Sequence, residues 1–244
     1  MNDVLTTEYI NFIKNGELGN NMLHLVDIIE KMEGNRTFVD IGVESGKSSK
    51  VLLHGSLANN NKVYGVDPIP AVGIPGILDH PNYTFIKKDS VAAGREWSSG
   101  KIDIAFIDSI HVKPQVMCEL YYWWDLVKTG GYLVFHDTEW GMKKDHDYYI
   151  HKSDHPCAGR RPGNKGMGCD FYAGKTWETP EYAIFDFFNI TDLNYEDDII
   201  KCNHYTSSLG MTYIQKKKDF DYKSKLNNWA NIENDRQSIL KCFI

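Results

Sequence analysis

Five short apolar runs, most of which end in an acidic residue, constrain the fold of this chain most strongly. They occupy residues 38–41, 62–67, 83–86, 102–108 and 131–137. Stretches with helical periodicity lie between several of these runs, for example at residues 114–127. Near-continuous apolar strands that alternate with helices are typical of a parallel sheet covered by helices on both faces. The pattern therefore predicts an α/β fold with a Rossmann-like, doubly wound, mostly parallel sheet.

The flanking segments indicate how the chain is organised. The expected parts are an N-terminal helical segment at 1–36, a sheet domain at 37–218 with a lid or insert at 140–177, and an amphipathic tail at 219–244. Residues 199–207 and 209–216 predict a terminal antiparallel strand pair. Thr179 and Pro180 predict the start of a helix that follows the insert.

Composition narrows the class of protein. A formal net charge of -6 would repel a polyanion, which makes nucleic acid an unfavourable main partner. The chain has no stretch of 18 apolar residues and no basic, apolar start, so we expect a cytoplasmic protein without a membrane segment. The five cysteines are scattered and predict reduced thiols: Cys118, Cys157, Cys169, Cys202 and Cys242. Apolar faces on the leading helices and the tail leave a homo-oligomer open.

The turn after the first strand predicts a ligand site. Gly42 and Gly46 would let the backbone approach a ligand closely, and Glu44 and Ser45 lie between them. Asp40, at the end of the strand, could hold a cationic amino group directly or through water. Ligands of doubly wound sheets bind at the carboxyl ends of the strands. We therefore expect this turn to form part of a cofactor site.

Other interpretations of the turn are weaker but stay open. A Walker phosphate loop needs four residues between its glycines, and only three separate Gly42 from Gly46. A dinucleotide fingerprint needs a glycine where Glu44 stands, and that carboxylate would repel a pyrophosphate. The glycines could also make a tight turn and nothing more.

The next two strand ends extend the predicted cofactor site. Asp67 lies 27 residues after Asp40 and is placed to accept hydrogen bonds from both hydroxyls of a ribose. Asp89 and Ser90 follow the third strand and could contact the edge of an adenine. With the glycine turn, these residues outline a site for an adenosyl group.

From residue 37 to residue 216, the chain resembles the class I S-adenosylmethionine (SAM)-dependent methyltransferases. The resemblance rests on the acid and glycine pattern of residues 40–46, on Asp67, and on the terminal strand pair. It implies SAM as the cofactor and places Asp108 at its edge. Glu44 departs from the family, which has a glycine at that position.

The fourth and fifth strands end in a second group of functional candidates. Asp108, His111, His136, Asp137 and Glu139 follow strands that are neighbours in the predicted sheet, so they would converge on one pocket. Carboxylate oxygens from two strand ends suit Mg²⁺ or Mn²⁺, with Asp108, His136 and Asp137 as ligands. His111 could remove a proton from the acceptor, with Asp108 and His136 as further catalytic groups.

This second group is similar to the site of metal-dependent sugar O-methyltransferases that act on macrolide glycosides. It is also similar to that of methyltransferases related to cephalosporin hydroxylase. Asp108, His111 and Asp137 match the arrangement in those enzymes, whereas His136 stands where they have an acid. The resemblance implies methyl transfer to an oxygen of a small hydroxylated acceptor, such as a sugar or a sugar-linked metabolite.

Alternative roles accompany these assignments. Asp108 alone could cap a helix, and His136 alone could be a hydrogen-bonded core histidine. His146, His151, His155, Cys157 and Cys169 could be imagined as a zinc cluster, although their spacing fits no standard site. Arg160, Arg161 and Lys165 of the insert favour a basic lid over an anionic acceptor. A non-catalytic scaffold, or a methyltransferase that acts on protein or nucleic acid, also stays open.

Overall fold

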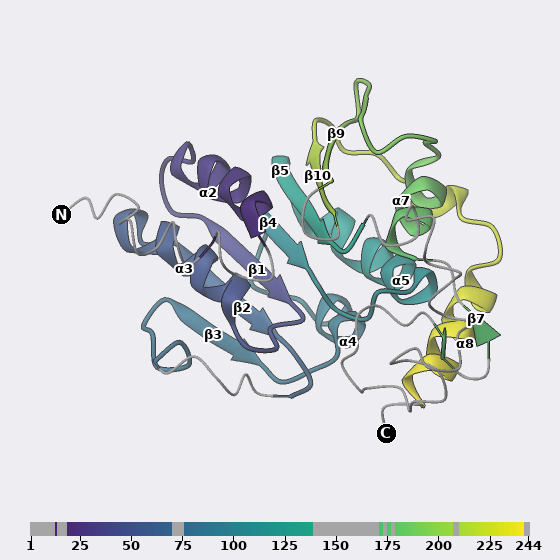
Figure 1. Cartoon of the computed structure of the whole chain (residues 1–244), viewed down its shortest axis with the longest axis horizontal. Coiled ribbons are helices and arrows are strands. Elements are labelled where there is room, and N and C mark those ends of the chain that lie inside the picture. Colours follow the sequence, from purple (N-terminus) through teal and green to yellow (C-terminus); the bar gives the residue numbers. More distant parts are fainter. Residues whose placement is uncertain are drawn as a thin grey trace.

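The computed structural model describes residue 13 and residues 19–69, 76–138, 171–172, 175–176, 179–206 and 210–241. Within these ranges, a sheet of eight strands forms the centre of the molecule (Figure 1). Its strands are β1 (Thr37–Ile41), β2 (Lys62–Val66), β3 (Tyr83–Ile86), β4 (Ile102–Ile107), β5 (Val127–His136), β8 (Tyr195–Glu196), β9 (Ile200–Tyr205) and β10 (Met211–Lys216). They lie in the order β3-β2-β1-β4-β5-β10-β9-β8.

The pairing of the strands confirms the predicted sheet. Strands β1 to β5 pair in parallel, whereas β10 pairs antiparallel with β5 and β9 pairs antiparallel with β10. The chain runs outward from β1 to β3 and then returns to place β4 on the other side of β1. The carboxyl ends of β1 and β4 therefore flank a topological switch point, the place where ligands bind in such sheets.

Helices cover both faces of this sheet. The α-helices are α2 (Met22–Glu30), α3 (Lys47–Asn59), α4 (Ser90–Arg95), α5 (Lys113–Trp123), α7 (Pro180–Phe188) and α8 (Trp229–Leu240). Short 3₁₀ turns span Gly19–Asn21, Trp124–Leu126 and Lys223–Lys225. Helices α2 and α3 lie on one side of the sheet, and α4, α5, α7 and α8 lie on the other (Figure 1).

The core is split by the sheet in the way that strand periodicity requires. Phe38 of β1 and Phe106 of β4 belong to the buried cluster beneath α2 and α3. Val39 of β1 and Ala105 of β4 belong to the cluster beneath α5 and α7. Successive side chains of a strand point to opposite faces, so continuous apolar runs bury both faces at once. In this doubly covered sheet, the carboxyl ends of the parallel strands lie at one edge.

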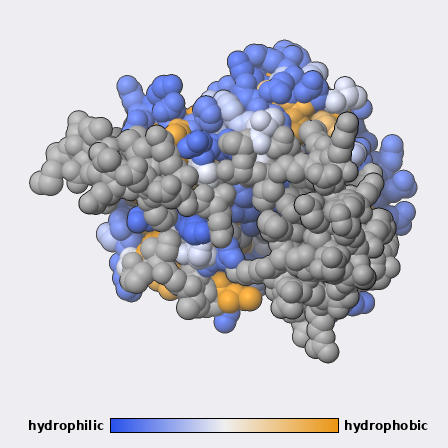
Figure 2. Space-filling model, viewed as in Figure 1, coloured by the Kyte–Doolittle hydropathy of each residue, from blue (hydrophilic) through white to orange (hydrophobic). Residues whose placement is uncertain are grey.

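Figure 2 shows largely hydrophilic side chains over the described part of one face, with small hydrophobic patches among them. The large apolar side chains that are exposed in the described ranges are Ile69, Leu78 and Tyr182. None of the described helices has the length and apolar character needed to cross a membrane.

Several element boundaries differ from those expected. The predicted helix at 114–127 is wrong at its end, because α5 stops at Trp123 and Val127 already pairs with Ile102 in the sheet. The indole N–H of Trp124 instead donates to the carbonyl of Phe220 at 3.0 Å. The sequence did not predict the six-residue helix α4 or the short strand β8. Whether such short elements form depends on tertiary contacts more than on local periodicity.

The segments that flank the sheet agree with the predictions only in part. Helix α2 confirms the second leading helix, whereas the first lies outside the described residues, except that Ile13 is buried. The expected helix after the insert is confirmed as α7, and the tail forms an α-helix from Trp229, after a 3₁₀ turn at Lys223–Lys225. In the insert, the described strands β6 (Phe171–Tyr172) and β7 (Lys175–Thr176) pair antiparallel. The insert's other residues lie outside the described ranges, including the basic lid residues and the His and Cys residues considered for zinc.

Candidate active site

The turn between β1 and α3 packs closely against the end of the neighbouring strand β4. Gly42 has a φ of 89°, and a Cβ atom there would lie 2.2 Å from the backbone oxygen of Asp108. The amide of Asp108 donates to the carbonyl of Ile41 at 2.8 Å. A side chain at position 42 would push the strand ends apart, so glycine is required both for its conformation and for this close approach.

The turn forms even though position 44, which is a glycine in the methyltransferases that the sequence resembles, is a glutamate. Glu44 adopts a φ of 45°, in the left-handed region that glycine tolerates best. Gly46 has a φ of 81° and precedes the first residue of α3. The amide of Glu44 donates to Asp67 Oδ2 at 3.1 Å. The glutamate therefore occupies a glycine-like conformation, and its backbone joins the turn to the end of β2.

Asp40 lies buried beneath this turn. Ser48 donates to its Oδ2 at 2.8 Å, and Ser49 makes a second, shorter hydrogen bond to the same oxygen. Burial raises the pKa of Asp40 from 3.8 to about 7; the hydrogen bonds from Ser49 and Ser48 oppose this rise, and the charges of Asp108 and Asp67 add to it. Oδ1 of Asp40 is buried and has no hydrogen-bond partner in the described part of the chain. A buried carboxylate oxygen without a partner is a suitable acceptor for a cationic amino group.

Asp67 lies at the rim of the same turn. Its Oδ1 accepts a hydrogen bond from the amide of Ile69 at 2.8 Å, and its Oδ2 accepts the one from Glu44. Each carboxylate oxygen has two lone pairs, so both can still accept from a ligand hydroxyl. These backbone contacts fix the carboxylate at the carboxyl end of β2, where the sequence predicted a ribose contact.

Asp89 and Ser90 make structural contacts as well. Oδ1 of Asp89 caps α4 by accepting from the amides of Val91 and Ala92, and it pairs closely with Arg236 of α8. Ser90 is buried and donates to Oε1 of Glu119 at 2.5 Å. The adenine contact assigned to these residues stays a prediction, for which Oδ2 of Asp89 is the available group.

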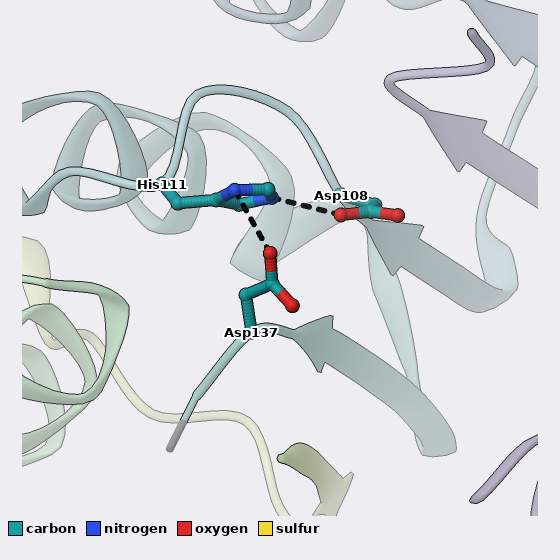
Figure 3. Close-up of side chains that lie close together, drawn as sticks. All are labelled: Asp108, His111 and Asp137. Carbon is teal, nitrogen blue, oxygen red and sulfur yellow. Dashed lines mark hydrogen bonds and ion pairs between the residues drawn. The ribbon is translucent and has the colours of Figure 1, made fainter. Parts of the chain in front are cut away.

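The second group of candidates lies where β4 and β5 end. Asp108, His111 and Asp137 can each offer one ligand atom, and these atoms all lie within 4.8 Å of one another. Figure 3 shows His111 between the two carboxylates. Its Nε2 is 2.8 Å from Asp108 Oδ1, and its Nδ1 is 3.0 Å from Asp137 Oδ2. The prediction that side chains of neighbouring strand ends converge is therefore met for these residues.

His136 completes this cluster from its buried side. Its Nδ1 lies 3.3 Å from Asp108 Oδ1 and 3.0 Å from Asp137 Oδ1. Its Nε2 is buried without a hydrogen-bond partner among the described residues. Asp137 has a φ of 56°, in the left-handed region that aspartate adopts more readily than most residues, and it lies in a bend directly after β5.

The two histidines and two aspartates compensate each other's charge. Burial by itself would lower the pKa of His111, but Asp137 and Asp108 outweigh it and raise the pKa to about 9. Burial likewise opposes the charged form of His136, and Asp108 and Asp137 hold its pKa well above the ordinary value. Burial would raise the pKa of Asp108, but His136 and His111 lower it strongly. The two carboxylates therefore favour the cationic form of each imidazole, against the effect of burial.

The structure also bears on the alternative roles. Asp108 caps no helix, because α5 begins after Val112 and the carboxylate faces the histidines. Glu139 lies outside the described residues. Ser48 and Ser49, which contact Asp40, and Tyr83, which contacts Ser49, were not predicted as site residues. Two serines directly after a glycine turn were the available signal for the first two.

Comparison with known proteins agrees with this architecture. Residues 39–138 match the family described as "Methyltransferase domain". This range begins in β1 and ends one residue after Asp137, so it contains the glycine turn and the second cluster. No curated protein sequence matches the chain significantly.

Solved structures with this fold come from several sources. A Corynebacterium glutamicum protein has 14% identity and a TM-score of 0.52, with 82% of each chain covered. MycE methyltransferase of the mycinamycin biosynthetic pathway, solved with Mg, S-adenosylhomocysteine (SAH) and mycinamycin VI, has 16% identity and a TM-score of 0.50; 88% of this chain and 54% of MycE are covered. A Clostridium thermocellum protein provisionally named an rRNA methylase has 14% identity and a TM-score of 0.53, with 82% and 98% covered. At these identities the likeness is one of fold.

Proposed function

We propose that this chain, a class I SAM-dependent methyltransferase by its domain match and its fold, methylates an oxygen of a small hydroxylated acceptor. The observation that carries the proposal is the cluster of Asp108, His111 and Asp137 beside the cofactor turn. Gly42 contacts the backbone of Asp108, so the turn and the cluster share one edge of the sheet. A methyl donor held on the turn would thus lie next to groups that can bind and deprotonate a hydroxyl.

Residues at different strand ends would bind different parts of the cofactor. We assign the methionine amino group to Asp40, the ribose hydroxyls to Asp67, and the adenine edge to Asp89 and Ser90. The SAM methyl group is already activated, so the protein needs chiefly to hold the acceptor oxygen about 3 Å away and in line with the methyl group.

His111 is the group we assign to proton removal. Its side chain is 24% exposed, compared with 7% for His136, so it is the more accessible imidazole of the cluster. Its raised pKa requires that it lose its own proton before it can act as a base. Asp108 and Asp137 orient the ring from both sides.

The same cluster fits a divalent cation. Two carboxylates and an imidazole with ligand atoms within 4.8 Å form a donor set suited to Mg²⁺ or Mn²⁺. Asp108 and Asp137 would hold the ion together with His136, whose Nδ1 lies beside both carboxylates, so that His111 would stay free to act as the base. A bound cation would lower the pKa of an acceptor hydroxyl. MycE, which has the same fold, was solved with Mg and SAH.

For the acceptor we propose a sugar or a sugar-linked metabolite. Its two neighbouring hydroxyls would suit the paired carboxylates and a cation between them. Arg160, Arg161 and Lys165 of the insert would favour an acceptor that also carries a phosphate or carboxylate.

The test is methyl transfer from SAM to methyl glycosides, mycinamycin VI and catechol, with SAH formation followed with and without Mg²⁺. We expect turnover with at least one acceptor. His111→Ala should lower kcat by a factor of about 10²–10⁴ while SAH still binds. Asp79→Asn, at an exposed aspartate that precedes β3 and is none of the assigned site residues, is the control and should leave turnover unchanged.

Two results would contradict the proposal. The chain could bind SAH yet methylate none of these acceptors, which favours a scaffold or a macromolecular substrate. Alternatively, single changes at Asp108, His111 and Asp137 could leave turnover unaltered, which would remove the catalytic assignment.

A further inference from the structure

A buried tyrosine reaches the cofactor turn from two strands away. Tyr83 is the first residue of β3 and is only 7% exposed. Its hydroxyl oxygen lies 3.1 Å from Ser49 Oγ, and Ser49 in turn is hydrogen-bonded to Oδ2 of Asp40. The three side chains therefore form a buried chain of hydrogen bonds that ends on the carboxylate beneath the turn.

A glycine makes room for this chain. In the sheet, Asp40 of β1 is paired with Gly65 of β2. A Cβ atom on Gly65 would lie 1.8 Å from the Tyr83 hydroxyl oxygen and 2.9 Å from a methyl group of Val43. Any side chain at position 65 would thus displace the tyrosine. Tyr83 reaches Ser49 because the strand between β3 and β1 lacks a side chain at that point.

The number of protons available fixes the direction of the hydrogen bonds when Asp40 is ionised. A carboxylate only accepts, so Ser48 and Ser49 must both donate to Oδ2. A serine hydroxyl has one proton, so Ser49 can only accept from Tyr83. Burial raises the pKa of Tyr83 above its ordinary value, which keeps the phenolic proton available.

This arrangement distinguishes the two oxygens of Asp40. Oδ2 receives both serine hydroxyls, whereas Oδ1 is buried and has no hydrogen-bond partner in the described part of the chain. A carboxylate held by one oxygen presents the other in a fixed direction. Hydrogen bonds in series also strengthen one another, so Tyr83 makes Ser49 a better donor to Asp40.

We propose that Tyr83 is a positioning residue which, through Ser49, holds the Asp40 carboxylate so that Oδ1 receives the amino group of the cofactor's methionine part. The proposal rests on the cofactor assignment made under the proposed function. It concerns cofactor binding alone and is independent of the acceptor, the metal and the base.

The test compares two ligands that differ in the group which Asp40 would bind. SAH carries the amino acid part, whereas 5′-methylthioadenosine keeps the adenosine and lacks the amino group. Calorimetric titration of Tyr83→Phe should show SAH binding weakened about three- to tenfold, the effect of losing one hydrogen bond. Binding of 5′-methylthioadenosine should stay within twofold of the unaltered protein. A variant that was merely less well folded would weaken both ligands alike.

Tyr64→Phe is the matched control. Tyr64 lies next to Gly65 on β2, on the other face of the sheet, where its ring packs edge-on against Trp97 at 5.0 Å between centroids. Tyr64→Phe removes the same hydroxyl group from the neighbouring strand, and it leaves the hydrogen bonds between Tyr83, Ser49 and Asp40 intact. We expect its affinity for both ligands to stay within twofold of the unaltered protein.

A double-mutant cycle provides a second readout. In an Asp40→Asn background, Tyr83→Phe should produce no further loss of SAH affinity, because the group that it positions has lost its charge. Additive losses would overturn the proposal, as would unchanged SAH affinity in Tyr83→Phe or equal weakening of the two ligands. Absence of SAH binding to the unaltered chain would overturn it together with the cofactor assignment. Failure of methyl transfer with SAH binding intact would contradict only the proposed function.

Discussion

Replacing Asp40 by asparagine should stabilise the ligand-free protein and at the same time weaken its binding of SAH. The carboxylate is fully buried and faces no cation in the described part of the chain, so the folded protein resists its ionisation. Asparagine has nearly the same shape, and its amide oxygen can still accept hydrogen bonds from Ser48 and Ser49. The substitution therefore removes a buried charge and keeps the hydrogen bonds from both serines, at the smaller cost of a buried amide NH₂ group in place of Oδ1, which has no partner among the described residues.

The pKa of Asp40 sets the size and the pH range of this effect. A rise from 3.8 to about 7 on folding corresponds to about 4 kcal/mol. Because the pKa is raised, the folded chain keeps a proton that the unfolded chain releases. The contribution of Asp40 to the free energy of unfolding of the unaltered protein is therefore largest below pH 3.8, and it is lost as the pH rises through about 7. The advantage of Asp40→Asn should therefore grow with pH and level off above pH 7.

Urea denaturation of the ligand-free protein at pH 5 and pH 8 measures this advantage. The free energy of unfolding of Asp40→Asn, minus that of the unaltered protein, should be about 2–3 kcal/mol larger at pH 8. The exposed Asp79→Asn carries the same chemical change and should show no such pH dependence. If Asp40→Asn were less stable than the unaltered protein at pH 8, Asp40 would not be a charge buried at a cost, and the reasoning would be refuted.

Three further substitutions test other parts of the account. Asp67→Ala should weaken SAH binding at least about tenfold in calorimetric titrations, because two ribose hydroxyls lose a charged acceptor; unchanged affinity would remove the ribose assignment. Gly42→Ala should lower the free energy of unfolding by at least about 3 kcal/mol, since the new methyl group meets the backbone of Asp108; a neutral effect would contradict the described turn. Arg236→Met should lower it by about 1–3 kcal/mol, because Gln115 and Asp89 lose a buried partner; full stability would show that α8 is not held by this contact.

The sheet could be predicted because its signal is local. Residues 38–41 and 83–86 are apolar runs bounded by polar residues, and the strands β1 and β3 contain them. The end of α5 could not be predicted in the same way. Residues 124–127 continue an apolar helical pattern, and their departure from the helix depends on pairing between Val127 and Ile102 and on the contact of Trp124 with Phe220.

The candidate site was predictable for a related reason. Parallel strands end at one edge of the sheet, so residues directly after them, such as Asp67, Asp108 and Asp137, could be brought together from strand order alone. The side chains that control them were not predictable. Tyr83 is 43 positions from Asp40 and reaches it only because Gly65 lacks a side chain. The bond from Arg236 to Asp89 likewise joins residues 147 positions apart.

The central claim is that the acidic and imidazole groups at the ends of β1, β2, β4 and β5 surround one cofactor. A crystal structure of the protein with SAH and Mg²⁺ tests this claim most directly. We expect the SAH amino group within hydrogen-bonding distance of Asp40, its ribose on Asp67, and its sulfur facing the cluster of Asp108, His111 and Asp137. SAH bound at another edge of the sheet, or with its sulfur turned away from His111, would contradict the account.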